Sequence, residues 1–456
     1  MSEEKNIKVK ATLSPSTVFL YGLGGMFPYG WILVITGYYF LFFMTDILRL
    51  PTVLAASIYS AIQWWKLAAM VISGIIIDGT SLRSGKYRGW VLITGIVMAA
   101  AFPIAFADFG LSQTGAAVVV VAAEAVLMMA YNIGWTGVRT LPNAMSKNGQ
   151  DVTWLSTASA VGGALPTALW GVLAAPMLSL PVWAGSSNAY AGCCAVFSVT
   201  LILGGVIIYK ISEPYDKPQA AGTGVKAEKI GLLDMIKNLN GPMIPFFIAQ
   251  TLSTAQAGFF STLLAYYTTH VLGNTAIAAQ VLSITSVISL IGSFFVPSIT
   301  KYLSKKGAHI ISQFTYCVCY ILMGLFGRNA GIFIALRCVM AAIGCVSNVV
   351  MYAFPVDIAD YNEMHGKDPA RAFLMSIGGT TIRLGYALST TIAAFGLAAI
   401  GYVTGVEVTA AMGTKIILLM VAGPAALALL SAVSMFAYKV DEKELEKYRA
   451  EKASKN

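Results

Sequence analysis

The 456-residue chain is poor in charge and in histidine. Asp, Glu, Lys and Arg make up 11% of its residues, and only three residues are histidines. A soluble domain of ordinary composition carries about 25% charged residues, so the composition excludes this class. We predict that His270, His309 and His365 are isolated from one another, at the ends of hydrophobic runs or between them. The sequence also has no Walker A motif and no nucleophile elbow. We therefore expect a protein that is not an enzyme and that needs no metal, ATP or other cofactor.

Cysteine is also scarce, and its spacing suits neither zinc nor a disulfide framework. All six cysteines fall inside apolar runs, where a thiol packs as a small hydrophobic group. They are Cys193, Cys194, Cys317, Cys319, Cys338 and Cys345.

Long hydrophobic runs dominate the chain, which is 57% hydrophobic and has a mean hydropathy of +0.72. Runs of roughly 20 apolar residues are typical of membrane-spanning helices, whereas a membrane β-barrel would show alternating segments of about 10 residues. The first run starts near Val18 and lacks a cleavage pattern, so we read it as a retained span. The twelve predicted spans cover about residues 17–44, 51–77, 89–108, 114–139, 153–178, 187–210, 241–269, 275–299, 308–328, 330–356, 371–402 and 412–438. The sequence predicts an all-α membrane protein with twelve transmembrane helices.

The net charge of +9 is distributed unevenly between the loops. Lysine and arginine gather before the first span, after the even-numbered spans and in the tail, while the opposite loops hold Arg49, Arg328 and, near the last span, Lys415. Cytoplasmic loops carry such an excess of positive charge. We therefore expect both termini in the cytoplasm and no nucleic-acid partner.

One long polar connector, residues 212–240, divides the spans into six plus six. We expect an N-terminal bundle (1–211), a cytoplasmic linker (212–240), a C-terminal bundle (241–438) and a cytoplasmic tail (439–456). The halves echo each other weakly, since span 1 ends "YYFLFFMTDILRLP" and span 7 ends "LLAYYTTHVLGNT". Two six-helix halves related by an axis along the membrane normal form a recurring transporter plan, with the substrate site near midplane.

Four stretches resemble one transporter family. They are "YGLGG" at 21–25, "TDILRLP" at 45–51, "GIIIDGTSLRSGKYRGW" at 74–90 and "DIADYNE" at 357–363. Across nearly its whole length the chain resembles the glycoside–pentoside–hexuronide:cation symporters, the melibiose-permease-like branch of the major facilitator superfamily. The resemblance implies the major facilitator fold and transport of a sugar-like solute by alternating access.

The chain departs from this family where the family binds its cation. Lys66 and Met70 occupy the positions of the two carboxylates that usually bind the coupling ion. The family's sugar-binding charges fall near Tyr29 or Gly30, near Gly134–Trp135 and near Thr157, while the basic residue of span 11 is retained as Arg383. The usual sodium site and sugar clamp are therefore expected to be absent.

Charged residues inside spans cost at least about 2.5–3.5 kcal/mol each on insertion scales, so they are expected to be paired or functional. Lys66 and Glu124 lie at similar depths in spans 2 and 4. Our first hypothesis is that the Lys66 ammonium replaces the coupling sodium. The alternatives are a purely structural Lys66–Glu124 pair and a proton carrier at Glu124.

Arg383 near midplane, together with Lys66, predicts an excess of positive charge in the cavity. Such an excess suits an anionic substrate, for example a carboxylate, a sulfonate or a uronide. Arg139 and Arg337 lie nearer helix ends, where snorkelling toward water is the simpler expectation.

Aromatic and amide side chains are the further candidates for substrate binding, because rings and amides suit a cyclic polar ligand. Core packing is the alternative for each of them. They are Tyr29, Trp31, Asn132, Trp135, Gln250, Gln256 and Asn348.

Two charged groups next to predicted spans are candidates for gating, since ion pairs between moving halves can hold one state. A solvated loop is the alternative. The first group is Asp78, Arg83, Lys86 and Arg88, and the second is Asp357, Asp360 and Glu363 with Arg371 nearby.

The sequence thus predicts a secondary active or facilitative transporter of a small polar solute, such as a sugar derivative or another organic anion. Proton symport through Glu124 and a non-transporting receptor on a transporter fold are the alternatives. We expect a monomer in the bacterial inner membrane, with the substrate, a proton as a second possible partner, and no sodium.

Overall fold

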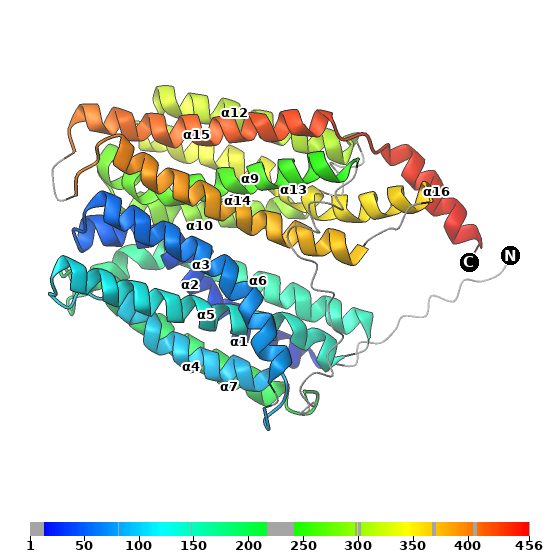
Figure 1. The fold of residues 1–456 in the computed structure, drawn as a ribbon, viewed down its shortest axis with the longest axis horizontal. Coiled ribbons are helices and arrows are strands. Elements are labelled where there is room, and N and C mark those ends of the chain that lie inside the picture. Colours follow the sequence, from blue (N-terminus) through cyan, green and yellow to red (C-terminus); the bar gives the residue numbers. More distant parts are fainter. Residues whose placement is uncertain are drawn as a thin grey trace. The chain divides into compact units, whose positions relative to one another are not determined.

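The computed structural model describes residues 13–80, 82–146, 148–216, 241–296, 299, 302–366, 371–404 and 408–455. This part of the chain is built from helices and contains no strand, as the sequence predicted (Figure 1). Eleven helical segments within it are long and apolar enough to cross a membrane. Helix α9 corresponds to the remaining predicted span. It is less apolar because it carries Gln250 and Gln256, both of which are buried.

The described residues fall into two compact units. Unit 1 comprises Met1–Phe43 and Trp64–Val225, and unit 2 comprises Met44–Gln63 and Lys226–Asn456. The segment Met44–Gln63 therefore groups with unit 2, although its sequence neighbours on both sides belong to unit 1. The division into 1–211 and 241–438 stays a prediction, and residues 217–240 of the predicted linker lie outside the described residues.

Among the described residues before the linker there are seven helices, and a π-helical turn, η1, continues the second of them. They are α1 (Pro15–Gly24), α2 (Met26–Phe42), η1 (Phe43–Ile47), α3 (Thr52–Gly79), α4 (Arg88–Ala105), α5 (Gln113–Met145), α6 (Gly149–Leu178) and α7 (Ala189–Ile211). Helix α4 packs against α5 and α7, and α1 packs against α6 and α7.

Glycine permits the close packing of α1. A Cβ atom on Gly204 of α7 would lie 2.6 Å from the carbonyl oxygen of Gly24, and one on Gly162 of α6 would lie 2.3 Å from that of Gly22. Small residues let membrane helices approach each other at the level of their backbones.

The helices after the linker again include a π-helical turn, η2. They are α9 (Met243–Tyr266), η2 (Tyr267–Val271), α10 (Ala276–Ser293), α12 (Lys305–Phe326), α13 (Ala330–Met364), α14 (Arg371–Ala399), α15 (Ala410–Phe436) and α16 (Glu442–Lys455). Helix α9 lies between α14 and α15. Its aromatic end contributes Phe246 and Phe247 to a core that includes Phe354 and Tyr438.

Two helical segments extend beyond the predicted spans in a way that matters for the site. Helix α13 continues to Met364 and not to residue 356, so the acidic group at 357–363 lies on its last turns. The tail also folds, since Glu442–Lys455 forms α16 at the C-terminal end of the chain (Figure 1).

Candidate functional site

The two ionisable side chains that we expected at one depth of unit 1 lie together. Lys66 of α3 places its Nζ 3.7 Å from Oε1 of Glu124 on α5. The Glu124 side chain is completely buried, and that of Lys66 is 20% exposed. Within the described part of the chain neither carboxylate oxygen of Glu124 has a hydrogen-bond partner. Trp65 donates from Nε1 to the Ala125 carbonyl at 3.0 Å, which joins the two helices at the same level. Lys66 therefore supplies the charge that compensates a buried carboxylate.

Side chains of α2 and α5 form an aromatic layer. The Tyr29 ring packs edge-on against Tyr131 at 5.5 Å and against Trp135 at 6.5 Å, and Tyr131 and Trp135 stack at 5.5 Å. The Arg139 guanidinium lies 4.9 Å from the centre of the Trp135 ring. Tyr29 is buried, whereas Trp135 is partly exposed and Arg139 is exposed, so the accessible edge of this layer is the Trp135–Arg139 pair.

Two other candidates of unit 1 have contacts inside their own bundle. Trp31 stacks flat on Phe197 of α7 at 3.9 Å and is 2% exposed, which is the environment of a packing residue. Asn132 is buried and donates from Nδ2 to the Met128 carbonyl one turn earlier at 2.8 Å.

The amide candidates of unit 2 differ in their surroundings. Gln250 accepts a hydrogen bond from the Thr381 hydroxyl on α14 at 2.9 Å. Gln256 donates to the Tyr320 hydroxyl at 3.4 Å, and its buried Oε1 has no hydrogen-bond partner within the described residues. Asn348 is exposed on α13.

The two intramembrane arginines of unit 2 are both half-buried. Arg337, which we expected to snorkel toward water, places its guanidinium 3.8 Å from the centre of the Phe260 ring. Its Nε is buried without a hydrogen-bond partner among the residues that the structure describes. Arg383 lies on α14. The Phe260 ring is thus a cation–π partner of the Arg337 side chain.

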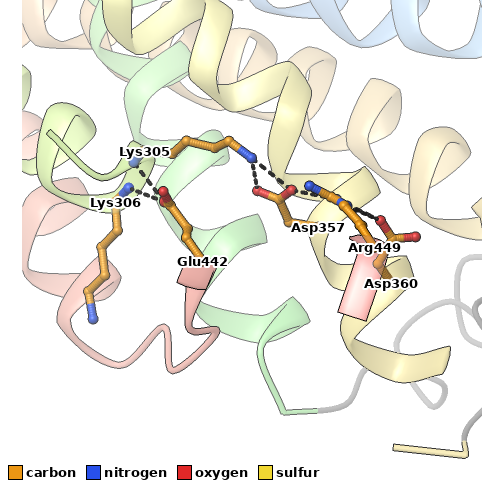
Figure 2. Close-up of polar contacts among 6 residues, drawn as sticks. All are labelled: Lys305, Lys306, Asp357, Asp360, Glu442 and Arg449. Atoms are coloured by element: carbon orange, nitrogen blue, oxygen red, sulfur yellow. Dashed lines mark hydrogen bonds and ion pairs between the residues drawn. The ribbon is translucent and has the colours of Figure 1, made fainter. Parts of the chain in front are cut away.

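A charge cluster ties the C-terminal helix to the end of α13 (Figure 2). Lys305 Nζ lies 2.6 Å from Oδ2 of Asp357, whose side chain is 3% exposed. Arg449 of α16 donates to Asp357 at 3.0 Å and to Asp360 at 2.6 and 2.8 Å. Burial lowers the pKa of Arg449, but the hydrogen bonds to Asp360 and Asp357 outweigh it, so that the pKa is raised. These acids therefore have basic partners inside unit 2, one of them from the tail.

A second contact anchors the start of α16. The Glu442 carboxylate accepts from the backbone N–H groups of Lys305 and Lys306 at 2.7 and 3.4 Å and so caps α12 (Figure 2). Burial raises the pKa of Glu442, and these N–H groups and the Lys305 charge oppose the shift. Lys306 Nζ donates to the Tyr438 carbonyl at 2.6 Å.

Lys86 and Arg88, two basic residues of the first gating candidate, are buried. The backbone at this place is bound by a carboxylate, Asp216, that the sequence analysis did not single out. Asp216 accepts hydrogen bonds from the backbone N–H groups of Tyr87 and Arg88 at 2.8 and 2.7 Å. Arg88 also lies 3.3 Å from Glu213. Lys86 is buried and Arg83 is exposed. The side chains of Asp78 and Arg371 lie outside the described residues, and Glu363 is half-buried on α13.

Two of the three histidines make contacts that the sequence did not indicate. His309 is completely buried on α12 and contacts the Ser347 and Ser431 hydroxyls at 2.8 and 3.1 Å. His270 contacts Asp46 at 2.8 Å. These partners are distant in sequence, so no local motif signals either contact. Among the described residues, no group of three or more His, Cys, Asp or Glu side chains gathers as a metal site.

Comparison with known proteins agrees with this architecture. A relative in Bacillus subtilis (strain 168), "Uncharacterized symporter YjmB", is 26% identical over 97% of this chain and 94% of its own length. The "Putative sulfoquinovose importer" of Escherichia coli (strain K12) is 25% identical over the same shares of the two chains. The crystal structure of the nucleoside transporter NupG superposes with a TM-score of 0.62 at 15% identity, covering 93% of this chain and 99% of that one. This last likeness shows the fold alone.

The sequence model of one family covers most of the chain. It is described as "MFS/sugar transport protein" and matches residues 20–442. With the helices long enough to cross a membrane, this match indicates an integral membrane protein that transports small solutes and not an enzyme. The chain belongs to the MFS/sugar transport protein family, in keeping with its resemblance to the melibiose-permease-like branch.

Proposed function

We propose that the chain is a secondary active or facilitative transporter of a small polar anion, such as a sugar derivative with a carboxylate or sulfonate group. Transport is by alternating access, and Lys66 replaces the coupling sodium. The observation that carries this proposal is the Lys66–Glu124 ion pair in unit 1. An ammonium at this position neutralises the buried carboxylate permanently, so unit 1 needs no bound cation to do so.

The charge balance inside the helices supports an anionic solute. Besides Lys66, the spans hold Arg139, Arg337 and Arg383 against a single deep carboxylate, Glu124. Arginine binds carboxylates and sulfonates through paired N–H donors. The E. coli relative is described as an importer of sulfoquinovose, which fits a substrate of this charge. Partly exposed Trp135 and exposed Asn348 are the best placed of the ring and amide candidates.

Proton symport through Glu124 is the second candidate. It is favoured by the complete burial of the carboxylate and its lack of hydrogen bonds within the described chain. The 3.7 Å approach of Lys66 opposes it, because a nearby ammonium favours the ionised carboxylate. We keep three further expectations as parts of the proposal, namely a monomer, the bacterial inner membrane and cytoplasmic termini.

A thermal-shift screen of the purified full-length protein tests the substrate class. It compares matched ligands, glucuronate and sulfoquinovose against glucose, with sodium or potassium as the only cation and at pH 6 and pH 8. We expect the anionic member of each pair to raise the melting temperature equally in both salts. Stabilisation by glucose alone would contradict the anionic class, and stabilisation only in sodium would contradict the role of Lys66.

A further inference from the structure

Two π-helical turns stand at corresponding places in the two halves of the sequence. Turn η1 (Phe43–Ile47) and turn η2 (Tyr267–Val271) lie where "FFMTDILRLP" and "AYYTTHVLGNT" echo each other. Asp46 is the fourth residue of the first turn and His270 the fourth residue of the second. Single π-turns inside helices are frequent at functional sites, and these two bring an acid and a base to matching positions.

Asp46 and His270 are in contact with each other, and Tyr402 contacts both of them. Nε2 of His270 lies 2.8 Å from Oδ1 of Asp46. The Tyr402 hydroxyl donates to the same oxygen at 2.6 Å and lies 2.9 Å from Nε2. The His270 and Asp46 side chains are 17% and 13% exposed. The group is therefore largely desolvated but still open to protons from water.

These contacts place a hydrogen on Nε2 of His270. A phenol has one hydrogen, and Tyr402 gives it to Asp46. Burial and then the Asp46 carboxylate raise the pKa of Tyr402, so this hydroxyl stays protonated. If Nε2 carried no hydrogen, two acceptor atoms would face each other at 2.8 Å. A neutral imidazole with its hydrogen on Nε2 satisfies this contact, and a protonated imidazole adds a positive charge beside the carboxylate, which strengthens the hydrogen bond.

Further hydrogen bonds on either side of this group connect the segment to the rest of unit 2. Thr45 donates to Asp46 within the segment at 2.6 Å, and its hydroxyl lies 2.6 Å from the Tyr266 hydroxyl. Thr52 donates to the Tyr402 carbonyl at 2.7 Å, and the Ser60 and Thr391 hydroxyls lie 2.9 Å apart.

The other ionisable groups around the cluster come from four directions. Tyr266 lies on α9 and Tyr59 on α3, both buried. Lys415 of α15 donates to the Ile400 carbonyl, two residues before Tyr402. Arg49 is exposed after η1 with a left-handed φ of 54°. Of these groups and the cluster itself, only histidine is of a type that ordinarily titrates between pH 5 and 8.

We propose that Asp46, His270 and Tyr402 form a proton-binding site that holds Met44–Gln63 more firmly to the rest of unit 2 when His270 is protonated and loosens it when that proton leaves. The ligand is a proton, taken up by the imidazole beside the Asp46 carboxylate. Phe43 and Trp64, which flank the segment, belong to unit 1. On the proposed transport function, loosening of the segment is a step of alternating access and makes that step sensitive to pH.

Hydrogen exchange of the purified full-length protein, without substrate, tests the site. We expect peptides within Met44–Gln63 to exchange about tenfold faster at pH 8.5 than at pH 5.5, after correction for the intrinsic pH dependence. His270→Gln donates an uncharged amide hydrogen to Asp46 at every pH, as the neutral imidazole does, and should exchange at both pH values as the wild type does at pH 8.5. His270→Ala should give fast exchange at both. His365→Gln, at an exposed histidine that contacts the Tyr361 carbonyl, should keep the wild-type profile.

Equal corrected exchange at both pH values in the wild type would overturn the proposal. So would a His270→Gln protein that keeps the wild-type pH dependence. Asp46→Asn provides a second variant, identified as folded by its elution volume, and it should lose the pH dependence as well. Because no substrate is present, these outcomes are independent of the thermal-shift screen that tests the substrate class.

Discussion

Among single side chains, Glu124 is the group whose environment demands the most explanation. It is completely buried and, within the described chain, has no hydrogen bond to either oxygen. Removing the counter-charge of a buried ion leaves an uncompensated charge, which costs far more than the pair itself contributes. The Lys66 ammonium is thus structural and, on our proposal, functional at once.

Lys66→Met should lower the stability of the protein by about 3–5 kcal/mol, because Glu124 is left unpaired. The double variant Lys66→Met with Glu124→Leu should recover most of this loss, since no buried charge then remains at the site of the pair. Thermal unfolding monitored by intrinsic fluorescence measures both. Lys415→Met, at an exposed lysine, is the matched control and should change little. A single variant as stable as the wild type would show that the pair does not compensate Glu124.

Two tryptophans that look alike in the sequence should behave differently. Trp31 is 2% exposed and stacked on Phe197, so Trp31→Ala should cost about 3–5 kcal/mol of stability. Trp135 is partly exposed beside Arg139, so Trp135→Ala should weaken ligand binding several-fold with a smaller loss of stability. Calorimetric titration with the best ligand of the screen, at a temperature where both variants are folded, separates the two effects. Equal losses of affinity would contradict the assignment.

Among the helices, α16 shows what sequence patterns could not reveal. The sequence predicted only a cytoplasmic tail in which Lys and Arg gather, yet Arg449 contacts Asp357 and Asp360, and Glu442 caps α12 (Figure 2). The contacting residues are 89 or more positions apart in the sequence, so no local period predicts them. The hydrophobic runs, in contrast, are local, and they placed most spans within a few residues.

Arg449→Ala should release the end of α16 from α13. Hydrogen exchange of peptides within Glu442–Lys455 should then rise toward that of an isolated helix, because a 14-residue helix is marginal alone. Arg328→Ala, at an exposed arginine that donates to Thr414, is the control. Exchange of α16 that stays as slow as in the wild type would show that the ion cluster does not hold the helix.

Substitution by alanine should have opposite effects on stability at Gly413 and at Gly204. Gly→Ala inside a helix ordinarily stabilises by about 0.8–1.0 kcal/mol, and Gly413→Ala, with no atom within 4 Å of the added Cβ, should do so. Gly204→Ala should instead lower the melting temperature, because its Cβ would meet the Gly24 carbonyl at 2.6 Å. Thermal unfolding of the two variants side by side provides the measurement. Stabilisation by both would mean that α1 and α7 do not require this close approach.

For the molecule as a whole, composition and hydropathy were sufficient to predict an all-helical membrane protein, and the resemblance of four motifs added the major facilitator type. The proximity of Lys66 and Glu124 was also predictable, since depth along a span follows from residue number. The Asp46–His270 contact and the burial of His309 were not, because they depend on how helices far apart in sequence pack. The contact of Arg337 with the Phe260 ring was not predictable for the same reason, because the two residues lie on different helices.

On the proposed function, fixed positive charge in the protein, and not a bound sodium ion, prepares it to transport an anionic solute. The decisive experiment is uptake of the strongest anionic ligand of the screen into proteoliposomes, with sodium or potassium as the only external cation. We expect uptake at equal rates in the two salts, inhibited by glucuronate or sulfoquinovose and not by glucose. Uptake that requires sodium, or that glucose alone inhibits, would contradict the proposal.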